Sequence, residues 1–165
     1  MYKRQVLDLL APDEVILTAD TIVVLDGEII GKPRDAADAR RTLERLRGRE
    51  HVVYTALVLR TAERMTTDVV RTLVYMRDYS DAEIAAYIAR GEPFDKAGSY
   101  AVQDPLFHPV EQVEGCYMNV LGLPLCRLCW RLRELGLAVP VEPKEICRPL
   151  VGECPLAEVE GCDGG

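Results

Sequence analysis

The sequence predicts one mixed α/β domain in which β-hairpins alternate with amphipathic helices. A tight-turn signal at Asp26-Gly27 separates two runs of β-branched residues. Helical patterns with capping residues follow at residues 35–48 and 80–91. The 165 residues, 48% of them apolar, suffice for one buried core. We therefore expect a mixed sheet with hairpins and flanking helices.

The first hairpin is predicted within residues 14–33, "EVILTADTIVVLDGEIIGKP". One apolar strand is expected to end at Asp20, and a strand–turn–strand unit to follow around Asp26-Gly27. Pro33 closes the hairpin because it has no N–H to donate to a strand ladder. Asp20 is thus expected at a strand end, and Lys32 at the end of the hairpin.

Both predicted helices carry start and stop signals. Asp35 suits the N-terminal cap of the first helix, and Gly48 suits its C-terminal cap. Ser80 and Glu83 form a capping box at the second helix, which Gly91 closes. The helices are therefore well bounded by local chemistry.

Between the two helices, residues 51–61 and 66–79 predict two long strands. The short connector at residues 62–65 predicts that they pair antiparallel. Residues 92–119 are expected to be irregular, and a further helix is expected at about residues 125–135. We divide the chain into a domain at residues 1–138 and an irregular, cysteine-containing tail at residues 139–165.

Composition excludes several functional classes. The net charge of −7 argues against nucleic-acid binding, which usually needs a basic face. No apolar run approaches the ~20 residues that span a bilayer. The N-terminus lacks the apolar run and cleavage site of a signal peptide. We therefore expect a cytoplasmic protein that binds neither nucleic acid nor membrane, and we leave a homodimer open.

Six cysteines lie in the C-terminal third of the chain. Cys126 and Cys129 have CxxC spacing, but leucines recur around them at helical intervals. We favour helix thiols over a redox or zinc pair, since no second CxxC completes a zinc site. A metal-binding module built on the C-terminal cysteines is a further alternative.

Two side chains of the first hairpin suggest phosphate and metal chemistry. A carboxylate such as Asp20 can bind a divalent metal or activate water. The alternative is a turn aspartate with no chemical role. Lys32 lies between Gly31 and Pro33 and can meet a phosphate as a point charge. A solvated hairpin lysine is the alternative.

The irregular segment carries a second group of candidates. "FDKAGSY" pairs Asp95 with Lys96 ahead of small residues, which let a backbone approach a ligand closely. The Gln103 amide both donates and accepts hydrogen bonds, so it can contact a base edge. A polar loop is the alternative. His51 and His108 lack a nucleophile and an orienting partner, and we expect both to be structural.

Four blocks in order carry a family resemblance: "ADTIVVLDGEIIGKP", "DAADARRTLERLRGREHVVYTALVL", "YIARGEPFDKAGSYAVQ" and "VEGCYMNVLGLPL". From about Val15 to about Leu135 the chain resembles the Maf family of nucleoside triphosphate pyrophosphatases. The resemblance implies a mixed α/β fold with two lobes and a central cleft. It also implies cleavage of a nucleoside triphosphate to the monophosphate and pyrophosphate with a divalent metal, Mg²⁺ or Mn²⁺.

The resemblance also implies roles for individual residues. Asp20 matches the proton acceptor that activates water and helps to hold the metal. Thr21 and Gln103 match positions linked to substrate preference. Lys32 and Lys96 match lysines that face phosphate, and Asp95 is a weaker match. The blocks "SYAVQ" and "GCYMNVLGLPL" are similar to the branch acting on dTTP and UTP, with non-standard nucleotides as further substrates.

One feature of the family has no counterpart in this sequence. The family begins with a strand and an arginine-bearing loop of the type "SxSPRR", but no such motif precedes Val15. Residues 1–10 show no resemblance to the family. We therefore expect the N-terminal βα unit to be missing from this chain. The alternative function is a non-catalytic nucleotide-binding or division-associated protein, inactive because that loop is absent.

Overall fold

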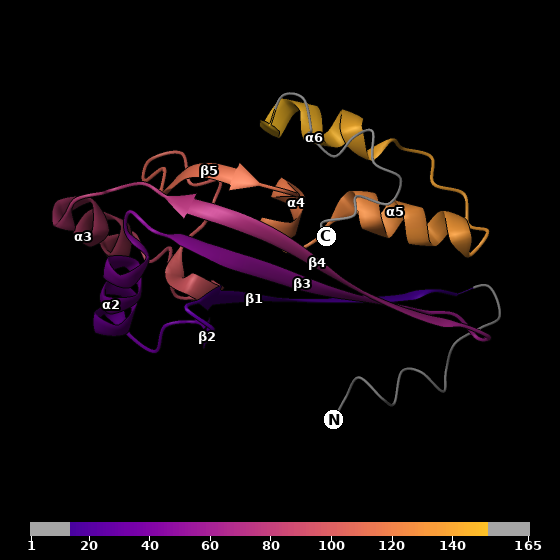
Figure 1. Cartoon of the computed structure of the whole chain (residues 1–165), viewed down its shortest axis with the longest axis horizontal. Helices are drawn as coiled ribbons and strands as arrows, with labels where there is room; N and C mark the ends of the chain where they lie inside the picture. The colour runs from indigo at the N-terminus through magenta and orange to yellow at the C-terminus, as the bar shows by residue number, and fades with distance from the viewer. Residues whose placement is uncertain (1–13, 152–165) are drawn as a thin grey trace.

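The computed structural model of the protein describes residues 14–151 (Figure 1). One antiparallel sheet in the order β2-β1-β3-β4-β5 forms its centre. The strands are β1 (Ile16–Leu25), β2 (Glu28–Ile30), β3 (Glu50–Arg60), β4 (Met65–Met76) and β5 (Val110–Glu114). The helices are α2 (Ala36–Leu46), α3 (Asp81–Ala89), η2 (Ala97–Ser99), α4 (Tyr117–Val120), α5 (Leu125–Glu134) and α6 (Pro143–Val151). This confirms the mixed α/β class with flanking helices.

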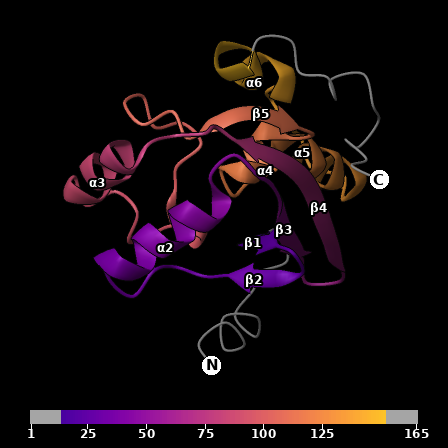
Figure 2. The same cartoon turned by 60° about the vertical axis from the view of Figure 1, so that its left-hand side comes forward.

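The helices gather at two places along the long strands. Figures 1 and 2 show α2 and α3 at one end of the sheet and α4, α5 and α6 together farther along it. α2 and α3 cover one hydrophobic cluster, and α5 covers a second one. Leu43 and Val53 belong to the cluster at α2 and α3, whereas Leu57 and Leu128 belong to the cluster at α5.

A polar position separates these two clusters. Residues two apart on a strand share a face, so Val53, Thr55 and Leu57 point the same way from β3. Thr55 is fully buried between the two apolar neighbours. The core is therefore divided where Thr55 lies, which is the physical counterpart of the two lobes that the family resemblance implies.

The local signals at the helix ends are confirmed. The Asp35 carboxylate accepts a hydrogen bond of 2.7 Å from the N–H of Asp38 at the start of α2. Ser80 and Glu83 form the expected capping box on α3. Gly48 and Gly91 follow the two helices with φ of +63° and +79°, a conformation that glycine adopts without strain.

The pairing of the long strands is also confirmed. β3 and β4 pair antiparallel from Glu50↔Tyr75 to Arg60↔Met65, with residues 61–64 as the connector. β1 differs from the prediction, because it is one continuous strand through Asp20. Its pairing with β3 from Ile16 to Val24 holds the polar residues at its centre in the strand.

Two segments hold more regular structure than the sequence predicted. Within residues 92–119 the chain forms η2, β5 and α4, and β5 pairs with β4 through Val113↔Val74. The prediction of an irregular tail is wrong for the residues of α6. Pro143 occupies the first position of this helix, where the backbone needs no N–H donor. The domain boundary at residue 138 stays a prediction. The expected absence of an N-terminal βα unit lies outside the described residues.

The described cysteines contribute to packing. Cys129 on α5 is buried and Cys126 half-buried, as expected of helix thiols. Among residues 14–151, no group of three or more His, Cys, Asp or Glu side chains could hold a metal. Cys154 and Cys162 lie outside the described residues. In the same part of the chain, no helix combines the length and hydropathy needed to cross a membrane.

Candidate active site

All six candidate residues line one cavity of about 320 Å³. The cavity lies where β1, the segment after β2, the segment around η2 and the turn after α4 meet. The candidates that line it are Asp20, Thr21, Lys32, Asp95, Lys96 and Gln103. The fold thus brings together side chains that are up to 83 positions apart in sequence, from residue 20 to residue 103.

The structure corrects the expected position of Asp20. Asp20 lies in the middle of β1, opposite Ala56 of β3, and not at a strand end. β2 pairs only with Val23–Leu25, so among the described residues no strand pairs with the other edge of β1 at Asp20. Neighbouring residues on a strand point to opposite faces, but at such an open edge Asp20 and Thr21 can both border one cavity.

The two lysines of the cavity have different surroundings. The Lys96 ammonium lies 2.6 Å from Oδ1 of Asp95 and donates a hydrogen bond of 2.7 Å to the carbonyl of Glu92. The hydrogen bond from Lys96 lowers the pKa of Asp95, and the charge of Lys32 adds to the effect. Lys32 itself is exposed and, within residues 14–151, makes no ion pair. Within the described residues, Lys32 thus brings a positive charge with no ion-pair partner to this end of the cavity, whereas the charge of Lys96 is paired with Asp95.

A backbone contact joins the segments that carry the two lysines. The N–H of Gly98 donates a hydrogen bond of 3.2 Å to the carbonyl of Gly31, next to Lys32. Gly98 has a φ of +74°, and a Cβ there would lie 3.1 Å from Cγ2 of Val23. A side chain at this position would therefore crowd the floor of the cavity.

The rest of the cavity is mainly apolar. Its apolar lining comes from Val23, Val53, Ala97, Tyr100, Ala101, Val102, Val120 and Leu121. Tyr100 is buried, and its hydroxyl lies 2.7 Å from Nε2 of His51. Burial lowers the pKa of His51 to about 4. His51 contacts the hydroxyl of Tyr100 and does not itself line the cavity, in agreement with a structural role.

A buried polar network adjoins Thr21. Oγ1 of Thr21 lies 2.8 Å from Oγ1 of Thr55, which donates a hydrogen bond of 3.0 Å to the carbonyl of Asn119. The Asn119 amide donates to the carbonyl of Val53 and to the hydroxyl of Thr72. This network links the cavity to α4. Thr55 and Thr72 were not predicted, because buried hydroxyls in apolar strands carry no local motif. The part of Asn119 in this network was not predicted either, because its partners Val53 and Thr72 lie 66 and 47 positions away in sequence.

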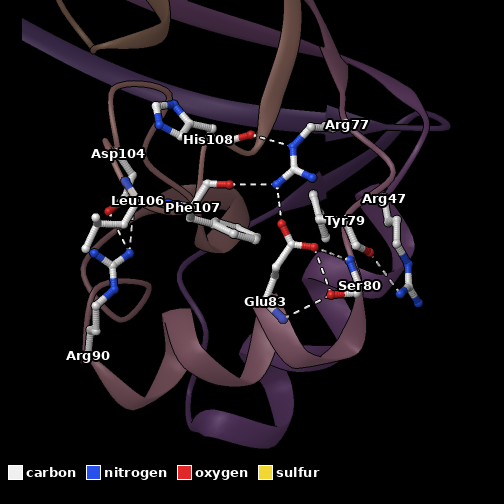
Figure 3. A network of polar contacts seen from close by, with 10 residues as sticks. All are labelled: Arg47, Arg77, Tyr79, Ser80, Glu83, Arg90, Asp104, Leu106, Phe107 and His108. Carbon is white, nitrogen blue, oxygen red and sulfur yellow. Dashed lines mark hydrogen bonds and ion pairs between the residues drawn. The ribbon is translucent and has the colours of Figure 1, made fainter.

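The segment that follows Gln103 is anchored to α3 and to the residue that follows β4 (Figure 3). The Asp104 carboxylate accepts hydrogen bonds from the N–H groups of Leu106 and Phe107, and it faces Arg90. Burial favours the neutral acid, but these hydrogen bonds outweigh it and lower the pKa of Asp104. Arg77 donates to the carbonyls of Phe107 and His108 and pairs with Glu83. Gln103 is therefore held at a fixed end of this segment.

The carboxylates of the cavity suit a hard divalent cation. Mg²⁺ is usually held by one or two carboxylates together with substrate phosphates, and it keeps several waters. The Asp20 side chain is exposed, and no hydrogen bond or ion pair within the described chain engages it. Asp20 is thus the carboxylate that would hold such an ion, while Asp95 is engaged by Lys96.

A family model described as "Maf-like protein" matches residues 2–135 of this sequence. The chain belongs to the Maf family. The Maf match begins at residue 2, so the expectation that residues 1–10 show no resemblance is wrong. Those residues lie outside the described part of the structure.

Several curated Maf relatives are named dTTP/UTP pyrophosphatase. The protein of Thermomicrobium roseum is 46% identical over 160 residues, which cover 96% of this chain and 73% of the relative. The protein of Dictyoglomus turgidum is 53% identical over 127 residues, covering 76% of this chain and 66% of the relative. That of Geotalea uraniireducens is 52% identical over 120 residues, covering 72% and 62%. The matches thus span about two thirds of the length of these Maf proteins.

Proposed function

We propose that this Maf protein is a nucleoside triphosphate pyrophosphatase that acts on dTTP and UTP. It would hydrolyse the triphosphate between the α- and β-phosphates to give the monophosphate and pyrophosphate. The observation that carries the proposal is the single cavity lined by Asp20, both lysines, Thr21 and Gln103. The names of the relatives at 46% to 53% identity support the choice of substrates.

The two ends of the cavity suit the two ends of a nucleotide. Lys32 and Lys96 would neutralise the phosphates, because a triphosphate carries several negative charges that increase on the leaving pyrophosphate. The apolar lining around Val53, Val102 and Leu121 would receive the base. Thr21 and Gln103 would contact its polar edge, as both can accept a hydrogen bond.

Asp20 would act as the general base. Its exposed carboxylate would accept a proton from the water that attacks phosphorus, and the bond to the pyrophosphate oxygen would then break. Asp20 would also hold Mg²⁺ or Mn²⁺, which, when bound, supplies charge neutralisation at the phosphates. The cytoplasmic location and a homodimer stay predictions.

Pyrophosphate release from dTTP and UTP, measured with Mg²⁺ or Mn²⁺, tests the proposal. We expect Asp20→Asn to lower kcat at least about 100-fold, because general-base catalysis contributes that much or more. Asp26→Asn is the matched control, since Asp26 lies at the tip of the same hairpin and pairs with Arg49 outside the cavity. Nucleotide binding without any pyrophosphate release would instead favour the non-catalytic alternative.

A further inference from the structure

A chain of hydroxyl groups connects the cavity to the buried centre of the sheet. Thr21 and Thr55 are directly opposite one another on β1 and β3, and their Oγ1 atoms are 2.8 Å apart. Oγ1 of Thr55 is also 3.0 Å from the carbonyl oxygen of Asn119. Thr55 is fully buried, so bulk water does not compete for its hydrogen bond to Asn119.

The number of protons sets the direction of both hydrogen bonds. A threonine hydroxyl has one proton to donate and lone pairs to accept. The Asn119 carbonyl can only accept, so the proton of Thr55 points to Asn119. Thr55 therefore has no proton left for Thr21. It follows that Thr21 donates its own proton to Thr55.

Thr21 thus presents only lone pairs to the cavity. Gly122 keeps this oxygen accessible, because a Cβ at that position would lie 3.3 Å from Oγ1 of Thr21. On the same face of the sheet, Val23 and Val53 flank the two threonines and line the cavity. The hydroxyl oxygen is therefore an acceptor in an apolar setting, where a mismatched partner is costly.

We propose that Thr55 is a specificity-determining residue that holds Thr21 as a hydrogen-bond acceptor toward the bound base. This inference rests on the proposed function. Uracil and thymine carry a donor at N3, whereas cytosine has an acceptor there. An acceptor-only Thr21 favours the first two bases and repels the third. Thr55 selects the base without touching it.

The experiment compares UTP with CTP. Thr55→Val keeps the shape of the side chain but frees the proton of Thr21, which can then donate to N3 of cytosine. We expect the preference for UTP over CTP in kcat/KM to fall about tenfold, the size of one correctly directed hydrogen bond. An unchanged preference in this variant overturns the proposal.

Two control variants distinguish a change in the hydrogen-bond direction at Thr21 from a general loss of structure. Thr55→Ser retains the hydroxyl and should restore the preference for UTP. Thr72→Val removes another fully buried hydroxyl, which bonds to Asn119 and Cys116 but not to Thr21. Thr72→Val should lose stability in urea unfolding and keep the preference. If it lowers the preference as much as Thr55→Val does, the proposal is wrong.

A binding measurement on the unmodified protein covers the case in which Thr55→Val does not fold. Calorimetric titration without metal should show UMP binding about tenfold more tightly than CMP, and equal affinities overturn the inference. Failure of the proposed function has a different outcome. In that case neither UTP nor dTTP releases pyrophosphate, while the difference between UMP and CMP still reports the polarity of Thr21.

Discussion

Arg90 and Asp104 form an ion pair that anchors the segment following Gln103 to α3 (Figure 3). Nη2 of Arg90 lies 2.8 Å and 2.9 Å from the two carboxylate oxygens of Asp104. The Asp104 side chain is only 5% exposed and also accepts the buried N–H of Phe107 at 2.6 Å. Gln103 directly precedes Asp104 in the chain. The Asp104 carboxylate therefore contributes both to the stability of the fold and to the position of Gln103 in the cavity.

Asp104→Ala should therefore destabilise the protein and weaken substrate binding. Removing the carboxylate leaves the N–H of Phe107 without its acceptor and Arg90 without its partner, at a cost of about 2–4 kcal/mol. Urea unfolding measures the loss, and KM for UTP measures the displacement of Gln103. Glu28→Ala is the control, since the Glu28–Arg45 pair is exposed and should contribute nothing measurable. Equal effects of the two variants would contradict the prediction.

His51 should make the folded state sensitive to mild acid. Burial holds its pKa at about 4, against 6.5 for an exposed histidine. Between these values the unfolded chain binds a proton that the folded protein does not, so stability falls as pH decreases. The slope is about 1.4 kcal/mol per pH unit, and the contribution is fully present only above pH ~6.5.

The pH effect is tested by urea unfolding between pH 7 and pH 5. His51→Gln cannot take up a proton and should flatten the slope over this interval. His108→Asn provides the control, because His108 is the other histidine and its side chain is exposed. A slope that survives in His51→Gln would assign the acid sensitivity to other groups.

Gly98→Ala should disturb the floor of the cavity. Its new Cβ would lie 3.1 Å from Cγ2 of Val23, on a backbone with φ of +74°. Gly27→Ala is a matched control, since Gly27 has φ of +81° with no atom within 4 Å of the added Cβ. Both changes strain the backbone by about 1 kcal/mol, so the additional loss in Gly98→Ala reports crowding. Thermal unfolding of the two variants checks the difference, which should be absent if crowding has no effect.

Lys96→Met should lower kcat/KM for triphosphates at least about tenfold, because it removes a positive charge at the phosphate end of the cavity. Lys144→Met, in the exposed part of α6, should have no effect. Asp95→Asn removes the ion-pair partner of Lys96 but leaves the positive charge of its ammonium in the cavity. We therefore expect this variant to keep most of the rate. A rate as low as that of Lys96→Met would show that the pair itself is required.

Local chemistry made much of the fold predictable. The turn at Asp26-Gly27 and the caps at Asp35 and Ser80 depend on hydrogen bonds within four residues, so the sequence alone determines them. The order of the four blocks selected six residues that line the cavity. β5 was missed because it is only five residues long and is held by its pairing with β4. α6 was missed because it contains Pro149, a residue that normally breaks or ends a helix.

The tertiary structure decided what these residues can do together. The register of β1 against β3 places Asp20 in mid-strand at an open edge, and it sets Thr21 opposite Thr55. A shift of β1 by one residue would turn Thr21 to the other face of the sheet, away from Thr55. The contact from Thr55 to Asn119 spans 64 positions and depends on where α4 packs. The sequence thus determined which candidate side chains the cavity holds. Strand register and helix packing decided how these side chains are oriented and which hydroxyl groups donate or accept hydrogen bonds.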